Sequence, residues 1–267
     1  MNSDDHALAA ELAAGAGDVL LGLRRDRGFA DPRALKDAGD QAAHEYLMAE
    51  LAARRPADAV LSEEGKDDRA RLDADRVWIV DPLDGTREFG EPRQPASGAA
   101  GDRSGEEGRD DWAVHVALWE RGRGLTAGAV ALPARGVTMS TADPMPLPSP
   151  SGLRVAVSRT RPPELVNALV EWLKERGIAA SLVPMGSAGV KITAVLRGEV
   201  DAYVHAGGQY EWDSAAPVAL VRAAGGHATR IDGSELAYNR GDVSLPDLLV
   251  CLPELASVLL EGIKAVR

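Results

Sequence analysis

The chain has 267 residues, of which 45% are hydrophobic, so it is long enough for one large domain or two small ones. It carries 30 basic and 41 acidic residues and a net charge of −11, which excludes the basic surface that sequence-independent binding to nucleic-acid polymers requires. An anionic substrate would therefore need a local reversal of charge, and bound cations would supply one.

Cysteine usage and apolar runs bear on the compartment. The single cysteine, Cys251, excludes a disulfide framework, which fits a reducing compartment. Because Cys251 lies in an apolar run, we expect a buried strand residue rather than a catalytic thiol. The acidic N-terminus lacks the features of a signal peptide, and no apolar run approaches the ~20 residues of a membrane span. We therefore expect a cytoplasmic protein without a membrane partner.

Apolar spacing and turn residues predict the first elements of the chain. These are a helix over Asp5–Arg24, a turn over Gly28–Pro32, a helix over Asp40–Arg54 and a short strand over Ala59–Leu61. Before the second helix, Asp37 or Asp40 would be its N-cap in a purely structural interpretation, and the alternative is a role in a site. The pair Glu63 and Glu64 after the strand, taken alone, indicates exposed charge.

The stretch Val77–Phe89 carries the clearest chemistry. Four apolar residues predict a buried strand that ends at Asp81, because the proline that follows cannot donate to a sheet ladder. Asp84, Gly85 and Thr86 come next. A strand that ends in two carboxylates and a Gly-Thr turn is suited to holding a hard cation beside a phosphate. The alternative is a plain turn, for which Asp-Pro and Asp-Gly are common.

From residue 91 to 110 there is no Val, Ile, Leu, Met or aromatic residue, which predicts a mobile loop, either a flap over the site or a plain surface insertion. Three strands of an antiparallel meander are predicted after it, over 112–119, 125–132 and 136–140.

The proline-rich stretch 142–151 predicts a boundary between an α+β domain, residues 1–150, and an α/β domain, residues 151–267. In the second domain, strands are predicted over 153–157, 178–183, 202–204 and 248–252, and helices over 163–176, 187–197, 214–224 and 253–266.

A third acid, Asp213, begins a predicted helix in Glu-Trp-Asp-Ser-Ala-Ala-Pro, residues 211–217. Alone it would be a helix N-cap, because an acid there stabilises the helix dipole by ~0.3–1 kcal/mol. Together, however, the acidic clusters resemble the lithium-sensitive, magnesium-dependent phosphomonoesterases. This superfamily includes inositol monophosphatase, fructose-1,6-bisphosphatase and bisphosphate nucleotidases. Residues 78–86 (Trp-Ile-Val-Asp-Pro-Leu-Asp-Gly-Thr) resemble its first motif and residues 211–216 its second, with Ser-Glu-Glu, residues 62–64, upstream.

The resemblance spans roughly residues 35 to 230 and implies an α/β fold, an α-β-α-β-α layered sandwich with the site between domains. Residues 61–64, 84–89, 157–159 and 185–191 resemble the CysQ-type branch, which acts on 3′-phosphoadenosine-5′-phosphate. We therefore expect hydrolysis of the 3′-phosphate of that nucleotide and of its sulfated relative, linked to sulfate assimilation.

The resemblance also implies roles for individual residues. Two or three Mg²⁺ ions would be held by the carboxylates of Glu63, Asp81, Asp84 and Asp213 and by the Leu83 carbonyl. Thr86, with Asp37 or Glu64, would hold the attacking water, whose pKa a metal lowers. The family places an Asp upstream of a Thr-x-x-Asp turn, and this chain departs from that pattern, so Asp37 is our choice there. The backbone amides of Gly85 and Thr86 would bind phosphate.

On the second domain the expected substrate-binding residues are Ser158, Arg159, Gly186, Ser187, Lys191 and Asp213. The alternative for Arg159 and Lys191 is an ordinary surface cation. His115 and His205 are expected to be structural.

Three alternatives stay open at this point. Within the same class the chain would be an inositol monophosphatase or a fructose-1,6-bisphosphatase. In a different class it would be a non-catalytic protein that binds divalent cations or phosphate, although the acids do not form a contiguous EF-hand loop. The partner would be a small anionic phosphorylated molecule, and the protein a monomer or homodimer.

Overall fold

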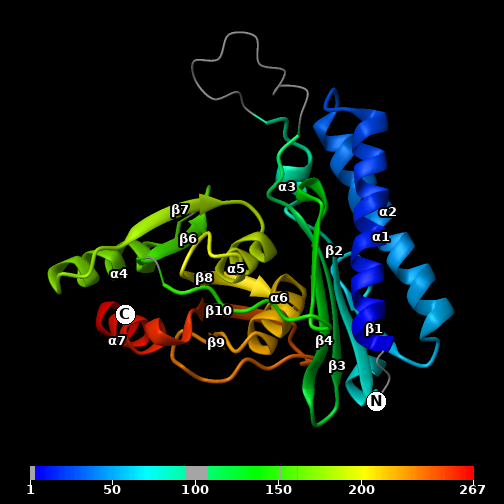
Figure 1. The fold of residues 1–267 in the computed structure, drawn as a ribbon. Helices are drawn as coiled ribbons and strands as arrows, with labels where there is room; N and C mark the ends of the chain where they lie inside the picture. The colour runs from blue at the N-terminus through cyan, green and yellow to red at the C-terminus, as the bar shows by residue number, and fades with distance from the viewer. Residues whose placement is uncertain (1–3, 94–107, 151, 161) are drawn as a thin grey trace.

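The structure is a computed structural model that describes residues 4–93, 108–150, 152–160 and 162–267 (Figure 1). Its elements stack as two helices, a sheet, two central helices, a second sheet and two outer helices. The predicted α-β-α-β-α sandwich is therefore confirmed. Apolar cores fill the spaces between successive layers.

The first sheet has the order β1-β2-β3-β4-β5 and is antiparallel except for the parallel pair β1 and β2. Its strands are β1 (Ala59–Ser62), β2 (Arg76–Asp84), β3 (Ala113–Glu120), β4 (Gly124–Leu132) and β5 (Val137–Ser140). The predicted meander is confirmed by β3, β4 and β5. The predicted loop falls largely on residues 94–107, which lie outside the described residues.

Two long helices, α1 (Asp4–Arg27) and α2 (Pro32–Arg54), cover the outer face of this sheet (Figure 1). By length and mean hydropathy alone, residues 5–27 pass the test for a membrane-spanning helix, although Glu11 and Asp18 interrupt the apolar sequence, so the absence of a membrane partner stays a prediction. A core helix of a soluble protein passes the same test. Here Leu8, Leu12 and Leu20 are fully buried in the core beneath α1.

The second helix begins earlier than the sequence analysis predicted. Asp31 is its N-cap, accepting a hydrogen bond from the Ala34 amide at 3.0 Å, and Pro32 occupies the first turn. Neither Asp37 nor Asp40 is a cap, since both lie within the helix. This shift of eight residues matters, because it decides which acid faces the site.

Strand β2 also differs from its prediction. It continues through Pro82 to Asp84, and only its pairing with β3 is interrupted between Asp81 and Asp84. The irregularity accommodates the proline, which has no amide hydrogen to donate. As a result Asp81 and Asp84 lie within the strand, on either side of a bulge, rather than after its end.

The second sheet has the order β7-β6-β8-β10-β9, with β6 parallel to β7 and β8 and the remaining pairs antiparallel. Its strands are β6 (Arg154–Ser158), β7 (Ser181–Met185), β8 (Ala202–Tyr210), β9 (His227–Thr229) and β10 (Ser244–Cys251). The sequence analysis missed the short β9 and the second half of β8. Cys251 is a fully buried strand residue, as predicted.

The remaining helices are α3 (Thr86–Phe89), α4 (Glu164–Glu175), α5 (Ala188–Leu196), α6 (Glu211–Ala223) and α7 (Ala256–Val266). Helices α5 and α6 lie between the sheets, and α4 and α7 cover the far face of the second sheet (Figure 1). The central core draws side chains from both halves of the chain. The domain boundary near residue 150 therefore stays a prediction.

Candidate active site

Three acids from distant parts of the chain meet where β2 ends and α6 begins. Carboxylate oxygens of Asp81, Asp84 and Asp213 lie within 4.8 Å of one another. Glu63 lies beside them, because β1 and β2 are parallel neighbours with Ser62 opposite Val80. The next residues along the chain, Glu63 and Asp81, are therefore adjacent. Glu63 and Asp81 share a side-chain hydrogen bond.

The cluster holds more negative charge than its surroundings compensate. Burial, with the charges of Glu63 and Asp84, raises the pKa of Asp81 well above its usual value. Burial and the charge of Asp84 raise the pKa of Asp213 to about 6. Loss of hydration and the charge of Asp213 raise the pKa of Glu63 to about 7. A hard divalent cation would relieve this repulsion.

Asp84 is tied to the other half of the molecule as well. Its Oδ1 accepts a hydrogen bond from the Ala188 amide at 3.0 Å, and its Oδ2 accepts from the Ser187 hydroxyl and the Gly189 amide. Burial alone would raise the pKa of Asp84. The His115 imidazole 3.2 Å away and these hydrogen-bond donors have the larger combined effect and lower this pKa to about 2. Because a carboxylate oxygen accepts two bonds, Oδ1 can still face a cation.

Thr86 pairs with Asp40, and the predicted pairing with Asp37 is corrected. The Thr86 hydroxyl donates to Asp40 Oδ1 at 3.3 Å and to the Leu83 carbonyl at 3.1 Å. Asp37, one turn earlier on α2, points to solvent, where its side chain is 72% exposed and 3.9 Å from Arg33. Burial, and then the charge of Glu64, raise the pKa of Asp40 to about 7. Asp40 would therefore accept a proton near neutral pH.

Gly85 permits the two halves of the site to approach each other. It is in the left-handed region at φ 92°, and a Cβ there would lie 3.1 Å from Ser187 and 3.2 Å from Trp112. The side chain of Leu83 is buried in the core, as a packing residue, and its carbonyl faces Thr86. The turn therefore places one carbonyl and one hydroxyl beside the acidic cluster.

A cavity of about 270 Å³ opens beside this turn. It brings together the following residues predicted to contact phosphate or substrate: Gly85, Thr86, Ser158, Arg159, Gly186, Ser187 and Lys191. Lys191 is 6% exposed, and its ammonium donates to the Gly186 carbonyl at 3.3 Å, which leaves further donor hydrogens for a ligand. A buried lysine here contradicts the alternative of an ordinary surface cation.

Other predicted substrate residues are already engaged by protein groups. Arg159 donates to both Glu88 and Glu91 at 2.9 Å. The Gly186 amide donates to Asp111 at 2.8 Å, and Ser187 is the N-cap of α5. These contacts shape the cavity wall, so direct binding of substrate by Arg159, Gly186 and Ser187 stays a prediction.

For three residues that hold the site together, the sequence analysis did not identify the contacts that they make. Asp40 was considered as a cap or as a site residue, and Asp37 was chosen for the site, although a helix start at Asp31 and Pro32 would have placed Asp40 inside the helix. Asp111 orients Gly186, and His115 bridges Asp84 and the Trp212 carbonyl, to which its Nδ1 lies at 3.0 Å. No local pattern marks these last two, because their partners are more than 30 residues away.

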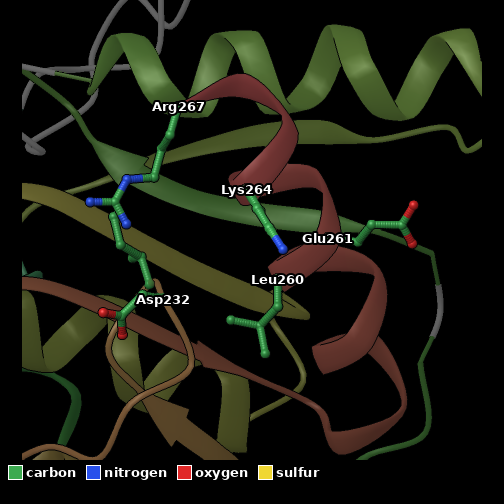
Figure 2. Close-up of a pocket in the computed structure, with 6 residues that line it drawn as sticks. Asp232, Leu260, Glu261, Lys264 and Arg267 are labelled. Carbon is green, nitrogen blue, oxygen red and sulfur yellow. The ribbon is translucent and has the colours of Figure 1, made fainter.

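A second cavity, of about 630 Å³, lies between α7 and the loop after β9 (Figure 2). Its lining combines the apolar Ile231 and Leu260 with acids and bases at the rim. Lys264 and Leu260 project from the same helix, and Asp232 faces them from the loop. None of the clustered acids described above contributes to it, so this cavity is separate from the acidic site.

Clustered carboxylates beside a Thr-Asp pair and a cationic cavity define a metal-dependent phosphomonoesterase site. The family model that describes the inositol monophosphatase family matches residues 2–264. The chain belongs to this family, and the fold and the phosphatase class expected from the sequence are confirmed.

Relatives narrow the position within the family. The 3′-phosphoadenosine 5′-phosphate phosphatase of Mycobacterium leprae is 49% identical over 275 residues, covering 98% of this chain and 94% of the relative. The 3′(2′),5′-bisphosphate nucleotidase CysQ of Escherichia coli is 31% identical, covering 85% of this chain and 91% of the relative. The crystal structure of CysQ from Bacteroides thetaiotaomicron superposes with a TM-score of 0.75 at 26% identity, covering 94% of this chain and 98% of that chain.

Proposed function

We propose that this protein is a Mg²⁺-dependent phosphatase that removes the 3′-phosphate of 3′-phosphoadenosine-5′-phosphate, and of its 5′-phosphosulfate relative. The observation that carries the catalytic part is the hydrogen bond from Thr86 to Asp40 beside the acidic cluster. The names of the relatives in M. leprae and E. coli support the nucleotide as substrate.

The donor set fits magnesium. All its candidate ligands are oxygens, and three buried or nearly buried carboxylates converge without a cationic side chain to pair each of them. Residues that would hold the ions are Glu63, Asp81, Asp84 and Asp213, with the carbonyl of Leu83. When bound, two or three Mg²⁺ ions would offset the phosphate charge and favour ionisation of water.

The chain's own groups would then handle the proton. The Thr86 hydroxyl donates toward Asp40, so its free lone pair would accept a hydrogen bond from water and orient it toward phosphorus. As the water gives up this proton to the Thr86 oxygen, the Thr86 hydroxyl proton would pass to Asp40, as the Asp40 pKa of about 7 allows. Glu64, whose charge acts on Asp40, would assist in positioning the water. The amides of Gly85 and Thr86 would bind the phosphate, and solvent would protonate the leaving alkoxide.

The cationic cavity would hold the rest of the substrate. Lys191 would contact a phosphate oxygen, and Ser158 and Arg159 line the same space. The partner is thus a small anionic phosphoester, whereas the cytoplasmic location, a link to sulfate assimilation and a monomeric or homodimeric state remain sequence predictions.

The test is phosphate release with Mg²⁺ from 3′-phosphoadenosine-5′-phosphate, inositol 1-phosphate and fructose 1,6-bisphosphate at equal low concentration, with and without lithium. We expect the nucleotide to be hydrolysed fastest and lithium to inhibit. The variant Asp81→Asn should remain folded and lose turnover. Preference for inositol phosphate or the sugar would contradict the nucleotide assignment, and binding without product would contradict catalysis.

A further inference from the structure

One aromatic side chain is placed unlike all the others. The chain has five Trp, four Tyr and two Phe residues, and all lie in the described part of the chain. Tyr210 alone among these aromatic residues is exposed, at 50%. Because a single exposed tyrosine is common on protein surfaces, its position has to decide whether it has a function.

The backbone of Tyr210 is hydrogen-bonded to the acidic cluster. It ends β8 directly before α6, and its backbone amide donates to Asp213 Oδ2 at 2.6 Å. The register of β8 with β10, where Tyr210 pairs with Ser244, fixes the same backbone from the other side. The ring is therefore attached to a rigid segment next to a predicted metal ligand.

The orientation of the Tyr210 ring is fixed by stacking. It stacks on Trp212 with centroids 4.8 Å apart and planes 16° apart, and Trp212 packs on the central core. One face of Tyr210 is thus covered by Trp212, and its exposure lies on the remaining surface. The neighbouring Gly207 and Gly208 are exposed and carry no side chain to cover it.

We propose that Tyr210 is the platform on which the nucleobase of the substrate stacks, extending the Trp212–Tyr210 pair by one ring. The inference rests on the proposed function. In a nucleoside 3′-phosphate only the ribose separates the base from the phosphate, so a phosphate at the Asp213 cluster brings the base to the neighbouring surface. A pre-oriented aromatic face binds a base without ordering a flexible side chain.

The test compares adenosine 5′-monophosphate with ribose 5-phosphate, which has a hydroxyl group in place of the base, as inhibitors of the wild type and of Tyr210 variants. We expect the wild type to bind the nucleotide more tightly. Tyr210→Ala should weaken inhibition by the nucleotide roughly 5- to 150-fold and bring the two inhibition constants together. Tyr210→Phe keeps the ring and should restore the difference to within about threefold. Val137→Ala, at a second exposed large apolar residue of the described chain, is the control.

Several outcomes would overturn the platform. These are equal inhibition of the wild type by both compounds, an unchanged ratio in Tyr210→Ala, or a Tyr210→Phe variant as impaired as Tyr210→Ala. A thermal melt of each variant separates loss of fold from loss of stacking. Failure of the proposed function would appear in the phosphate-release assay, as faster hydrolysis of inositol phosphate or sugar phosphate by the wild type. That result does not depend on the outcome of the inhibition assay.

Discussion

Replacing Asp40 by Asn would remove the proton acceptor of the proposed reaction and keep the shape of the side chain. The amide oxygen would still accept the hydrogen bond from Thr86, which now measures 3.3 Å. It would not take up a proton. Asp37→Asn is the matched control on the same helix, because Asp37 is exposed and lies 3.9 Å from Arg33.

General base catalysis contributes typically ~100- to 10,000-fold, so Asp40→Asn should lower kcat by about 100-fold or more with little change in KM. Asp37→Asn removes a surface ion pair of ~0.3–0.5 kcal/mol and should leave kcat within about twofold. The assay is phosphate release with saturating Mg²⁺.

The same variant should change stability in the opposite direction. Because the folded-state pKa of Asp40 is about 7 against an ordinary 3.8, ionising this carboxylate costs stability that builds up as pH rises through that interval. Neutral Asn avoids the cost. The full interval corresponds to roughly 4 kcal/mol, which solvent screening of the half-buried side chain reduces, so we expect a net gain of about 1 kcal/mol. The metal-free variant should therefore melt ~2–4 °C above the wild type at pH 8 and lose this advantage below pH 4.

In activity, the wild type should lose kcat as pH falls through the pKa of Asp40, at or below 7 once Mg²⁺ is bound, and Asp40→Asn should lack this limb. Two results would refute the assignment of Asp40. One is a kcat for Asp40→Asn within about tenfold of the wild type, and the other is an equal loss in both variants.

Three further results are expected. Mg²⁺ affinity, measured by calorimetry on the wild type, should fall as pH drops from 8 to 6. Protons compete with the metal for Glu63 and Asp213, whose pKa values are about 7 and about 6. A Mg²⁺ affinity that rises over this interval would contradict the ligand assignment. Lys191→Met should raise KM for the nucleotide about 10- to 100-fold by removing a buried charge-assisted bond, and an unchanged KM would exclude contact with substrate. Gly128→Ala should lower the free energy of unfolding by ~1–3 kcal/mol, because the added Cβ would lie 2.8 Å from a side chain of α6. Gly22→Ala should instead raise the free energy of unfolding by ~0.5–1 kcal/mol, because the nearest atom to its Cβ would be 3.8 Å away. Denaturant titration of both variants measures the two changes.

Local patterns predicted the parts of the site that are local in sequence. Asp81, Asp84, Gly85 and Thr86 follow one another within one strand and turn, so their chemistry was visible without the fold. Alternation of strand and helix was enough to predict an α/β unit in the second half of the chain, whereas the full α-β-α-β-α order was implied by the family resemblance. Short elements such as β9 were missed, because three residues cannot show a period.

The remaining residues depend on contacts that no short pattern records. Asp40 reaches Thr86 across 46 residues, and the correct choice required the true start of α2. Asp111 reaches Gly186 across 75 residues, and His115 reaches Trp212 across 97. Tertiary packing alone decides such pairs, so sequence reasoning named Asp37, an exposed acid one turn away from Asp40, and left His115 without a partner.

The nucleotide assignment is tested most directly in one tube. Equal amounts of 3′-phosphoadenosine-5′-phosphate, inositol 1-phosphate and fructose 1,6-bisphosphate would compete for the wild-type enzyme with Mg²⁺, followed by phosphorus NMR. The account predicts that the 3′-phosphate signal of the nucleotide disappears first and adenosine 5′-monophosphate accumulates. Earlier consumption of either other ester, or loss of the 5′-phosphate in place of the 3′-phosphate, would contradict it.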